Sequence, residues 1–164
     1  MNINHRIKYL IILMVISVTG CAPQPMVTST IGAIDSRNRI LIASQKSEFK
    51  EDIVSKVVKG FEEGHIYIEI IDLRNLSNIL TEDYQAIVIL NDYKFFQINR
   101  HARKFLKNVN DYERKKIVLL TTAGSPDLMK KSSEIDAISS ASVIEDTDTI
   151  SDKIIKKVNV ILSE

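Results

Sequence analysis

Two apolar runs, each without a polar residue, constrain the fold of this chain more than any other feature of its sequence. They are Ala86–Leu90 and Ile117–Leu120. A strand with one face in water alternates apolar and polar residues, whereas an unbroken apolar run indicates a strand that is covered on both faces. Such strands are typical of parallel sheets with helices packed above and below them. The two runs therefore predict an α/β fold.

The segments around these runs predict strands and helices in alternation. Further strands are expected at 40–43, 66–71 and 137–144, and apolar residues recur at helical spacing in three stretches between or after the strands. These stripes are Phe49, Ile53, Val57 and Phe61, then Ile98, Ala102, Phe105, Leu106 and Val109, and finally Ile150, Ile154, Val158, Ile161 and Leu162. The pattern predicts a three-layer sandwich with a five-stranded parallel sheet in the order 2-1-3-4-5. We expect its core to include Ile42, Ile53, Ile70, Val88, Phe105, Leu119 and Ile154.

The first residues of the chain have the layout of a secretory signal. Arg6 and Lys8 form a short cationic start, residues 9–18 carry no charge, and small residues precede Cys21, the one cysteine of the sequence. The apolar stretch is much shorter than the roughly 20 residues that a membrane-spanning helix needs. An ordinary signal peptide and an uncleaved signal anchor are both compatible with this layout.

The sequence Val18-Thr19-Gly20-Cys21 resembles the lipobox of bacterial lipoproteins. The resemblance implies that residues 1–20 are a signal peptide that is removed and that Cys21 is lipidated. Its acyl chains would hold the protein at the bacterial cell membrane or outer membrane, with the domain outside the cytoplasm. Residues 21–36 include two of the three prolines and show no clean period, so we expect a lipidated N-terminus and a tether. Residues 37–164 are then the folded domain.

Charge and motif content exclude several functions. The signal removes Arg6 and Lys8 from 22 basic residues, which leaves 20 against 21 acidic ones and a formal charge of −1. Nucleic-acid binding needs a clustered basic excess, so we expect none, and we expect the basic stretch 100–107 to be a solvated helix face. The sequence holds no nucleophile elbow, phosphate-binding P-loop or Cys/His spacing typical of metal sites. We therefore assign no catalytic residue and no metal ligand.

A buried strand, a loop and a helix that reads HARKFLK lie in 86–109, and the segment 116–124 reads KIVLLTTAG. Both segments resemble the flavodoxin superfamily, in particular its menaquinone-dependent protoporphyrinogen oxidase branch. The resemblance implies a flavodoxin-like domain in which the turn after the first strand binds the FMN phosphate. That turn is rich in Gly, Ser and Thr in the family and lies at a helix N-terminus, where free N–H groups meet the anion.

The corresponding turn of this chain departs from that pattern. Residues 44–52 contain no glycine, and Glu48, Glu51 and Asp52 stand at the start of the helix. Carboxylates in this position satisfy the helix dipole themselves and repel a phosphate. Although the polar residues of the turn can donate hydrogen bonds, we predict that the chain does not bind FMN tightly and needs no cofactor.

The carboxyl edge of the predicted sheet is nevertheless where a ligand or a partner is expected to bind, since loops meet there at the point where the strand order reverses. The candidate crevice residues are Ser44, Lys46, Ser47, Asn91, Tyr93, Phe95, Phe96, Thr122 and Gly124. The aromatic residues can stack on a flavin, cap the fold or contact a protein partner. We hypothesise an envelope lipoprotein with a non-catalytic interaction or structural module. FMN-dependent electron transfer is the alternative, and capture of a smaller ligand is a third.

Overall fold

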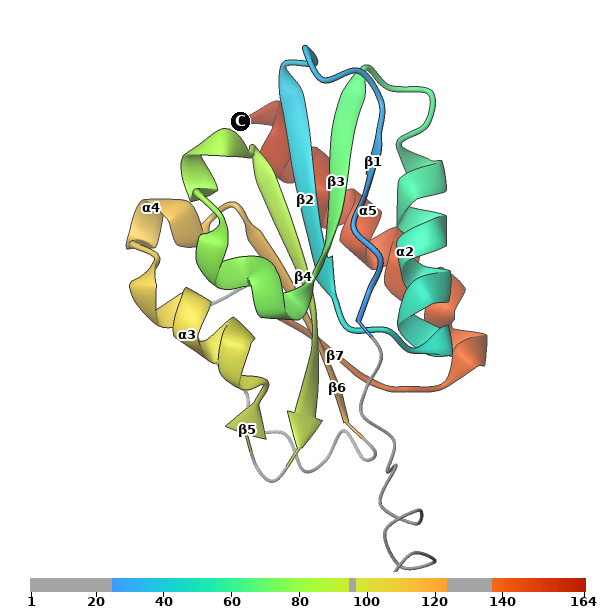
Figure 1. Cartoon of the computed structure of the whole chain (residues 1–164). Coiled ribbons are helices and arrows are strands. Elements are labelled where there is room, and N and C mark those ends of the chain that lie inside the picture. The colour runs from blue at the N-terminus through green and yellow to red at the C-terminus, as the bar shows by residue number, and fades with distance from the viewer. Residues whose placement is uncertain (1–24, 95–96, 124–136) are drawn as a thin grey trace, which may run out of the picture.

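The structure is a computed structural model that describes residues 25–94, 97–123 and 137–164. A mostly parallel sheet forms its middle layer, and helices cover both faces of the sheet (Figure 1). In the described residues the strands follow the order β1-β3-β2-β4-β6-β7, and β5 pairs with β4. Their bounds are β1 (Ser29–Ile31), β2 (Asn38–Ser44), β3 (Ile66–Asp72), β4 (Ala86–Lys94), β5 (Gln97–Ile98), β6 (Ile117–Ala123) and β7 (Ala137–Ala141).

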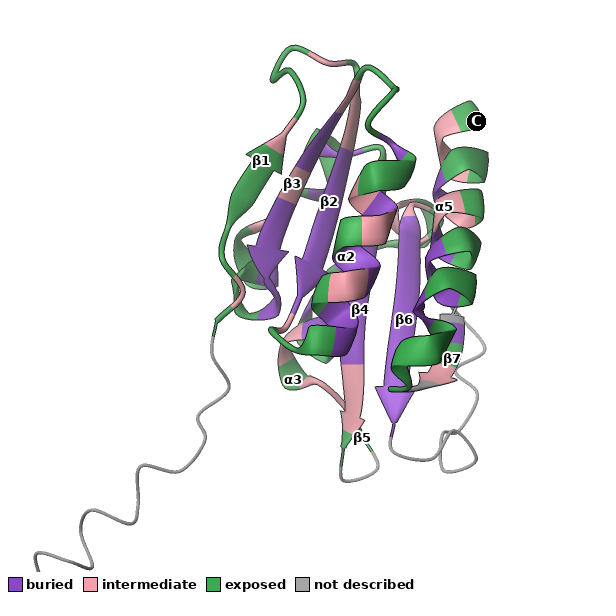
Figure 2. Ribbon diagram, turned by 90° about the vertical axis from the view of Figure 1, so that its right-hand side faces the viewer, coloured by how far each residue is buried: buried purple, intermediate pink, exposed green. Residues whose placement is uncertain are grey.

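The parallel part of the sheet confirms the predicted fold class. β3, β2, β4, β6 and β7 pair in parallel, which is the order 2-1-3-4-5 when these strands are counted along the chain. The two unbroken apolar runs lie in β4 and β6 in the middle of the sheet, where they are buried on both faces (Figure 2). Burial of both faces is what selected this apolar pattern over an alternating one.

Two hydrophobic clusters, one on each face of the sheet, form the core. α2 (Glu48–Gly60) and α5 (Thr147–Ser163) lie side by side over one face, while the 3-10 helix η1 (Leu73–Asn78) and α3 (Arg100–Asn108) cover the other. The short helices are η2 (Thr81–Asp83), α4 (Asp111–Arg114) and η4 (Ile144–Asp146). Each residue predicted for the core is exposed by 6% or less. Within the described part of the chain, no helix is both long enough and apolar enough to cross a membrane.

The segment after residue 24 corrects the expectation of an irregular tether over 21–36. Ser29–Ile31 form β1, which pairs antiparallel with β3 at the edge of the sheet. The backbone N–H of Met26 also donates to Oδ2 of Asp72 at 2.7 Å, and the Met26 side chain packs against the core. Residues 29–31 therefore belong to the sheet, while residues 21–24 lie outside the described part of the chain. A strand of three residues, of which two are polar, leaves no periodic pattern in the sequence.

Gly32 follows β1 in a backbone conformation that favours glycine. Its φ is +87°, and a Cβ atom at this position would lie 2.1 Å from the carbonyl oxygen of Ile66. Both the positive φ and the contact with backbone disfavour any other side chain.

We expect Gly32→Ala to lower the free energy of unfolding by about 1–3 kcal/mol, measured by urea denaturation, because alanine must strain the backbone there. Gly64→Ala is the matched control, since the nearest atom to its added Cβ would be the Cδ1 side-chain atom of Ile66 at 3.2 Å. An equal loss of stability in the two variants would show that the left-handed turn after β1 is unimportant.

Candidate functional site

A cavity lies at the carboxyl ends of the parallel strands, where the strand order reverses between β2 and β4. Its volume is about 360 Å³, and the turn before α2 and the ends of β4 and β6 contribute most of its walls. The described residues that line it are Gln45, Lys46, Ser47, Phe49, Lys50, Asp92, Tyr93, Lys94, Thr122, Ala123 and Ser142. The cavity occupies the place predicted for a ligand or partner, because carboxyl ends of neighbouring parallel strands converge at one sheet edge.

The predicted crevice residues fall into three groups. The first group lines the cavity and consists of Lys46, Ser47, Tyr93 and Thr122. Ser44 and Asn91 form the second group, and both are fully buried. Ser44 Oγ donates to the carbonyl oxygen of Gln45 at 3.1 Å, while Asn91 Oδ1 accepts a hydrogen bond of 2.8 Å from the backbone N–H of Asn99. The third group lies outside the described residues, as does Cys21, and consists of Phe95, Phe96 and Gly124.

An ion pair that the sequence alone does not reveal lies in the wall of this cavity. Lys50 in the first turn of α2 pairs with Asp92 near the end of β4, and the Lys50 side chain is only 3% exposed. Asp92 also lies 3.4 Å from the Lys94 ammonium and accepts a 3.4 Å hydrogen bond from Thr122 Oγ1. Lys50 stands four residues before the buried Val54, so helical spacing places both on the same face of α2. This spacing is the sequence signal that could have indicated the burial of Lys50.

The two partners of this pair respond differently to burial. Burial lowers the pKa of Lys50, although the Asp92 carboxylate opposes the change. Burial acts to raise the pKa of Asp92, but the charge and hydrogen bond of Lys50 outweigh it, so the pKa of Asp92 lies below its ordinary value. Asp92 is therefore ionised at neutral pH, and it compensates the buried ammonium.

The carboxylates expected to repel a phosphate do not line the cavity. Asp52 instead accepts a hydrogen bond from Thr147 Oγ1 at 2.5 Å and pairs with Lys56 at 2.8 Å, so it joins α2 to α5. Glu48 and Glu51 lie in the first turn of α2 as predicted, but they are exposed to solvent. None of the three carboxylates is in the described lining of this cavity, and their repulsion of a phosphate stays a prediction. Its described lining carries three lysines and one aspartate.

The N-terminus of α2 is capped from within the chain. Ser47 Oγ accepts a 3.3 Å hydrogen bond from the backbone N–H of Lys50, and the carbonyl oxygen of Ser47 accepts one of 2.8 Å from the N–H of Glu51. A side-chain cap of this kind satisfies an N–H group that a bound phosphate would otherwise use. Glu48 and Glu51 also complement the positive end of the helix dipole. The start of α2 consequently offers a bound anion fewer free N–H groups and a weaker positive potential than an uncapped helix start would.

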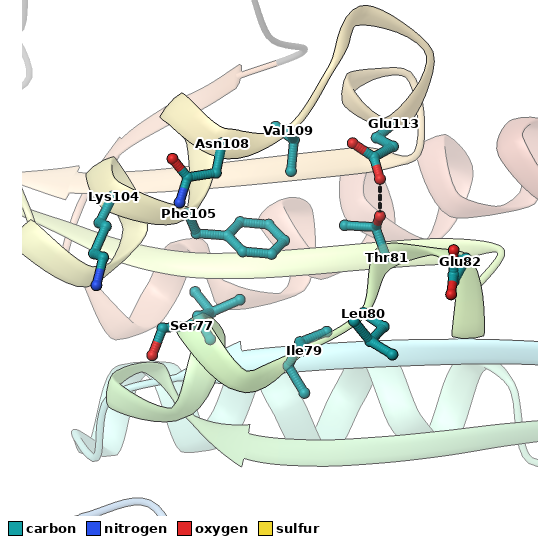
Figure 3. Close-up of a pocket in the computed structure, with 11 residues that line it drawn as sticks. Ser77, Ile79, Leu80, Thr81, Glu82, Lys104, Phe105, Asn108, Val109 and Glu113 are labelled. Atoms are coloured by element: carbon teal, nitrogen blue, oxygen red, sulfur yellow. Dashed lines mark hydrogen bonds between the residues drawn. The ribbon is translucent and has the colours of Figure 1, made fainter.

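A second cavity, of about 220 Å³, lies on the opposite face of the sheet between the segment that contains η1 and η2 and the helices α3 and α4 (Figure 3). Thr81 and Glu113 point toward one another across it and form a hydrogen bond. The other carboxylate oxygen of Glu113 accepts a 2.8 Å bond from the N–H of Asn110, which caps α4. These bonds lower the pKa of Glu113. Both carboxylate oxygens of Glu113 thus accept hydrogen bonds that hold α4 and η2 in place. Because the carboxylate of this second cavity has a structural role, we take the first cavity as the candidate site.

In the described residues no group of His, Cys, Asp and Glu is arranged to hold a metal ion. The candidate site consists of a crevice with more basic than acidic residues, a buried ion pair in its wall and a half-buried tyrosine, Tyr93, in its lining.

No model of a protein family matches this sequence, and the comparison with curated proteins finds no significant match. Solved structures do match. An oxidoreductase from Corynebacterium diphtheriae is similar with a TM-score of 0.55 and 14% identity over 79% of this chain and 100% of that chain. A flavodiiron core from Synechocystis sp. PCC6803 has a TM-score of 0.53 and 8% identity over 79% of this chain. This chain corresponds to 37% of the length of that protein.

An archaeal flavodoxin is also similar, with a TM-score of 0.49 and 10% identity over 75% of this chain and 98% of that chain. Identities this low show a shared fold and nothing about shared chemistry. Together with the strand order, the matches of higher TM-score confirm a flavodoxin-like α/β fold.

Proposed function

We propose that this protein is an envelope lipoprotein, anchored by acyl chains on Cys21, whose flavodoxin-like domain is a non-catalytic interaction or structural module. The anchor is supported by the order of cationic, apolar and small residues before Cys21. The choice of a module that does not depend on FMN is supported by one observation above all, the Lys50–Asp92 ion pair in the wall of the crevice. The expected partners are the membrane, through the anchor, and a protein of the envelope.

The ion pair opposes phosphate binding for an energetic reason. Lys50 is a buried cation in the first turn of α2, the helix start at which the flavodoxin resemblance implies a phosphate would bind, and Asp92 already neutralises it. A phosphate that took over Lys50 would leave the Asp92 carboxylate partly buried without its main partner, which costs free energy. The capped start of α2 and the lack of glycine in the turn 44–52 add to this cost.

FMN-dependent electron transfer is the second candidate, and the charge of the crevice favours it. Lys46, Lys50 and Lys94 outnumber Asp92 in the described lining, so the crevice attracts an anion at long range. Two proteins of similar fold are an oxidoreductase and a flavodiiron core, which is consistent with a redox role. A direct binding measurement separates the two candidates.

We expect FMN to bind the purified protein with a Kd no tighter than about 10⁻⁴ M, measured by quenching of flavin fluorescence and by the visible absorption spectrum. Binding at micromolar concentration or tighter would favour the flavoprotein, provided that Tyr93→Ala abolishes the quenching. Tyr112→Ala is the matched control, because Tyr112 is 71% exposed and does not line the crevice.

A further inference from the structure

We propose that the sheet edge at the carboxyl ends of β2, β3 and β4 faces the membrane and contacts anionic phospholipid headgroups. The inference rests on the proposed acylation of Cys21, and it names the membrane as the partner of this surface. We define the basic edge as Lys46, Arg74, Lys94, Arg100 and Arg103, all of which are exposed.

The place where the N-terminal segment joins the domain carries this inference. Met26 is held at the carboxyl end of β3, because its N–H donates to Asp72, the last residue of that strand. Met26 follows Cys21 by five positions, and such a stretch spans at most about 18 Å when fully extended. The start of β1 lies at the same end of the sheet as β5 and the end of β4 (Figure 1).

The length of the strands decides which edge can reach the membrane. β3 has seven residues, which at about 3.3 Å each place the opposite edge of the sheet about 23 Å away. The 18 Å connection is shorter than this distance, so it cannot pass around the domain and bring the opposite edge to the membrane surface. A tether of the full length predicted from the sequence would have allowed any orientation.

Exposed cations lie near the attachment point. Arg74 and Lys94 are paired with carboxylates, whereas Arg100 and Arg103 form no ion pair with a carboxylate among the described residues. Asp72 binds Met26 and also accepts a 2.7 Å hydrogen bond from Nε of Arg74, so the attachment point adjoins a cation of the basic edge. Arg103 donates to Gln97 of β5, which places it beside the β4–β5 hairpin. Each basic residue near an anionic membrane contributes about 1 kcal/mol of attraction, or about a fivefold preference.

The edge is polarised rather than uniformly basic. Glu48 and Glu51 are exposed at the start of α2, and Glu145, Asp146 and Asp148 are exposed around the start of α5. Arg74 belongs to η1 and Arg100 and Arg103 belong to α3, and these two elements cover the other face of the sheet, whereas Lys46 and Lys94 line the crevice beside α2. An anionic surface therefore selects the tilt that brings the η1 and α3 side of the edge closer to the headgroups.

Fluorescence quenching in vesicles tests this orientation. The acylated full-length protein would be placed in vesicles of phosphatidylcholine with and without phosphatidylglycerol, together with a lipid that carries a quencher on its headgroup. A fluorophore would be attached to Asn75→Cys, which adjoins Arg74 and removes no charge, or to Glu63→Cys at the opposite edge. Both positions are exposed, and acylation of Cys21 leaves the new cysteine as the reactive thiol.

We expect at least about twofold stronger quenching at position 75 than at position 63, with a larger difference in vesicles that contain phosphatidylglycerol and a smaller one at high salt. The double variant R100E/R103E should reduce the quenching at position 75, whereas K153E/K156E, of equal charge change on exposed residues of α5, should not. Equal quenching at both positions in protein that sediments with the vesicles would overturn the orientation and leave the anchor intact. Wild-type protein that does not sediment and retains a reactive Cys21 would overturn the anchor, and the orientation with it.

Discussion

Asp92→Ala is expected to lower the free energy of unfolding by about 3–5 kcal/mol, because it leaves the Lys50 ammonium buried without its partner. Lys50 is 2% exposed and is held under the first turn of α2, so water cannot replace the lost carboxylate at low cost. Urea denaturation followed by circular dichroism measures the change. The cavity wall between α2 and β4 should open before the rest of the fold, and hydrogen exchange of the residues after Ser47 would detect this.

Two further variants separate the buried pair from the exposed charges around it. Lys94→Met should cost less than about 1 kcal/mol, since Lys94 is 74% exposed and its ammonium lies 3.4 Å from Asp92. The double variant Lys50→Met with Asp92→Leu should recover most of the lost stability, because it removes both charges together. If Asp92→Ala were as stable as the wild type, the ion pair would not be the compensating interaction that we describe.

The dependence of stability on pH gives an independent check on the same pair. Because the pKa of Asp92 is lower in the folded state, the unfolded chain binds more protons in the acid range, and stability rises with pH there. The contribution of Asp92 is therefore complete above its ordinary pKa of about 3.9 and is lost as the pH falls through its folded pKa. The pKa of Lys50 is also lower in the folded state, so the unfolded chain binds more protons in the alkaline range too. The unfavourable contribution of the Lys50 charge is complete below its folded pKa and disappears as the pH rises to about 10.4, the ordinary pKa of lysine. In Lys50→Met we expect the free energy of unfolding to depend less on pH in the acid range. Its dependence on pH in the alkaline range, which comes from Lys50, should disappear.

Cys21→Ser is expected to abolish lipidation and leave an unprocessed precursor. The sulfur of Cys21 is the proposed attachment point, and a serine hydroxyl is a much poorer nucleophile than a thiolate at neutral pH. Acyl chains supply membrane affinity at about 0.8 kcal/mol per buried CH₂, so the variant loses this contribution and keeps only that of the apolar stretch 9–18 in the uncut signal. Mass spectrometry of the N-terminus and detergent phase partitioning measure the two effects.

Thr28→Ser is the matched control for this variant. It introduces the same serine seven residues later, at an exposed position before β1, and keeps the thiol. It should be processed and should partition into detergent like the wild type. If Cys21→Ser is still cut before residue 21 and still enters the detergent phase, acyl chains on Cys21 are not what holds the protein.

Much of the fold could be predicted because apolar patterns record local burial. The runs in β4 and β6 are apolar at every position because both of their faces are covered. The stripe of Phe49, Ile53 and Val57 lies on the side of α2 that faces the hydrophobic core, as its spacing predicts. The position of the crevice followed from the same pattern, because parallel strands bring their carboxyl ends to one edge. Part of its lining, including Lys46, Tyr93 and Thr122, could be named from the loops that follow those strands.

The sequence by itself therefore determined the parallel sheet, its strand order and the place of the crevice, together with the proposed signal at Cys21. Only the tertiary structure decided which polar side chains pair with one another at that edge and around it. Lys50 meets Asp92 across 42 residues, Met26 meets Asp72 across 46, and Asp52 meets Thr147 across 95. Each is a polar contact between residues that become neighbours only after the strands and helices have packed. A hydrophobic period reports whether a position is buried, but it does not report which distant charge or hydrogen-bond partner satisfies the polar group there.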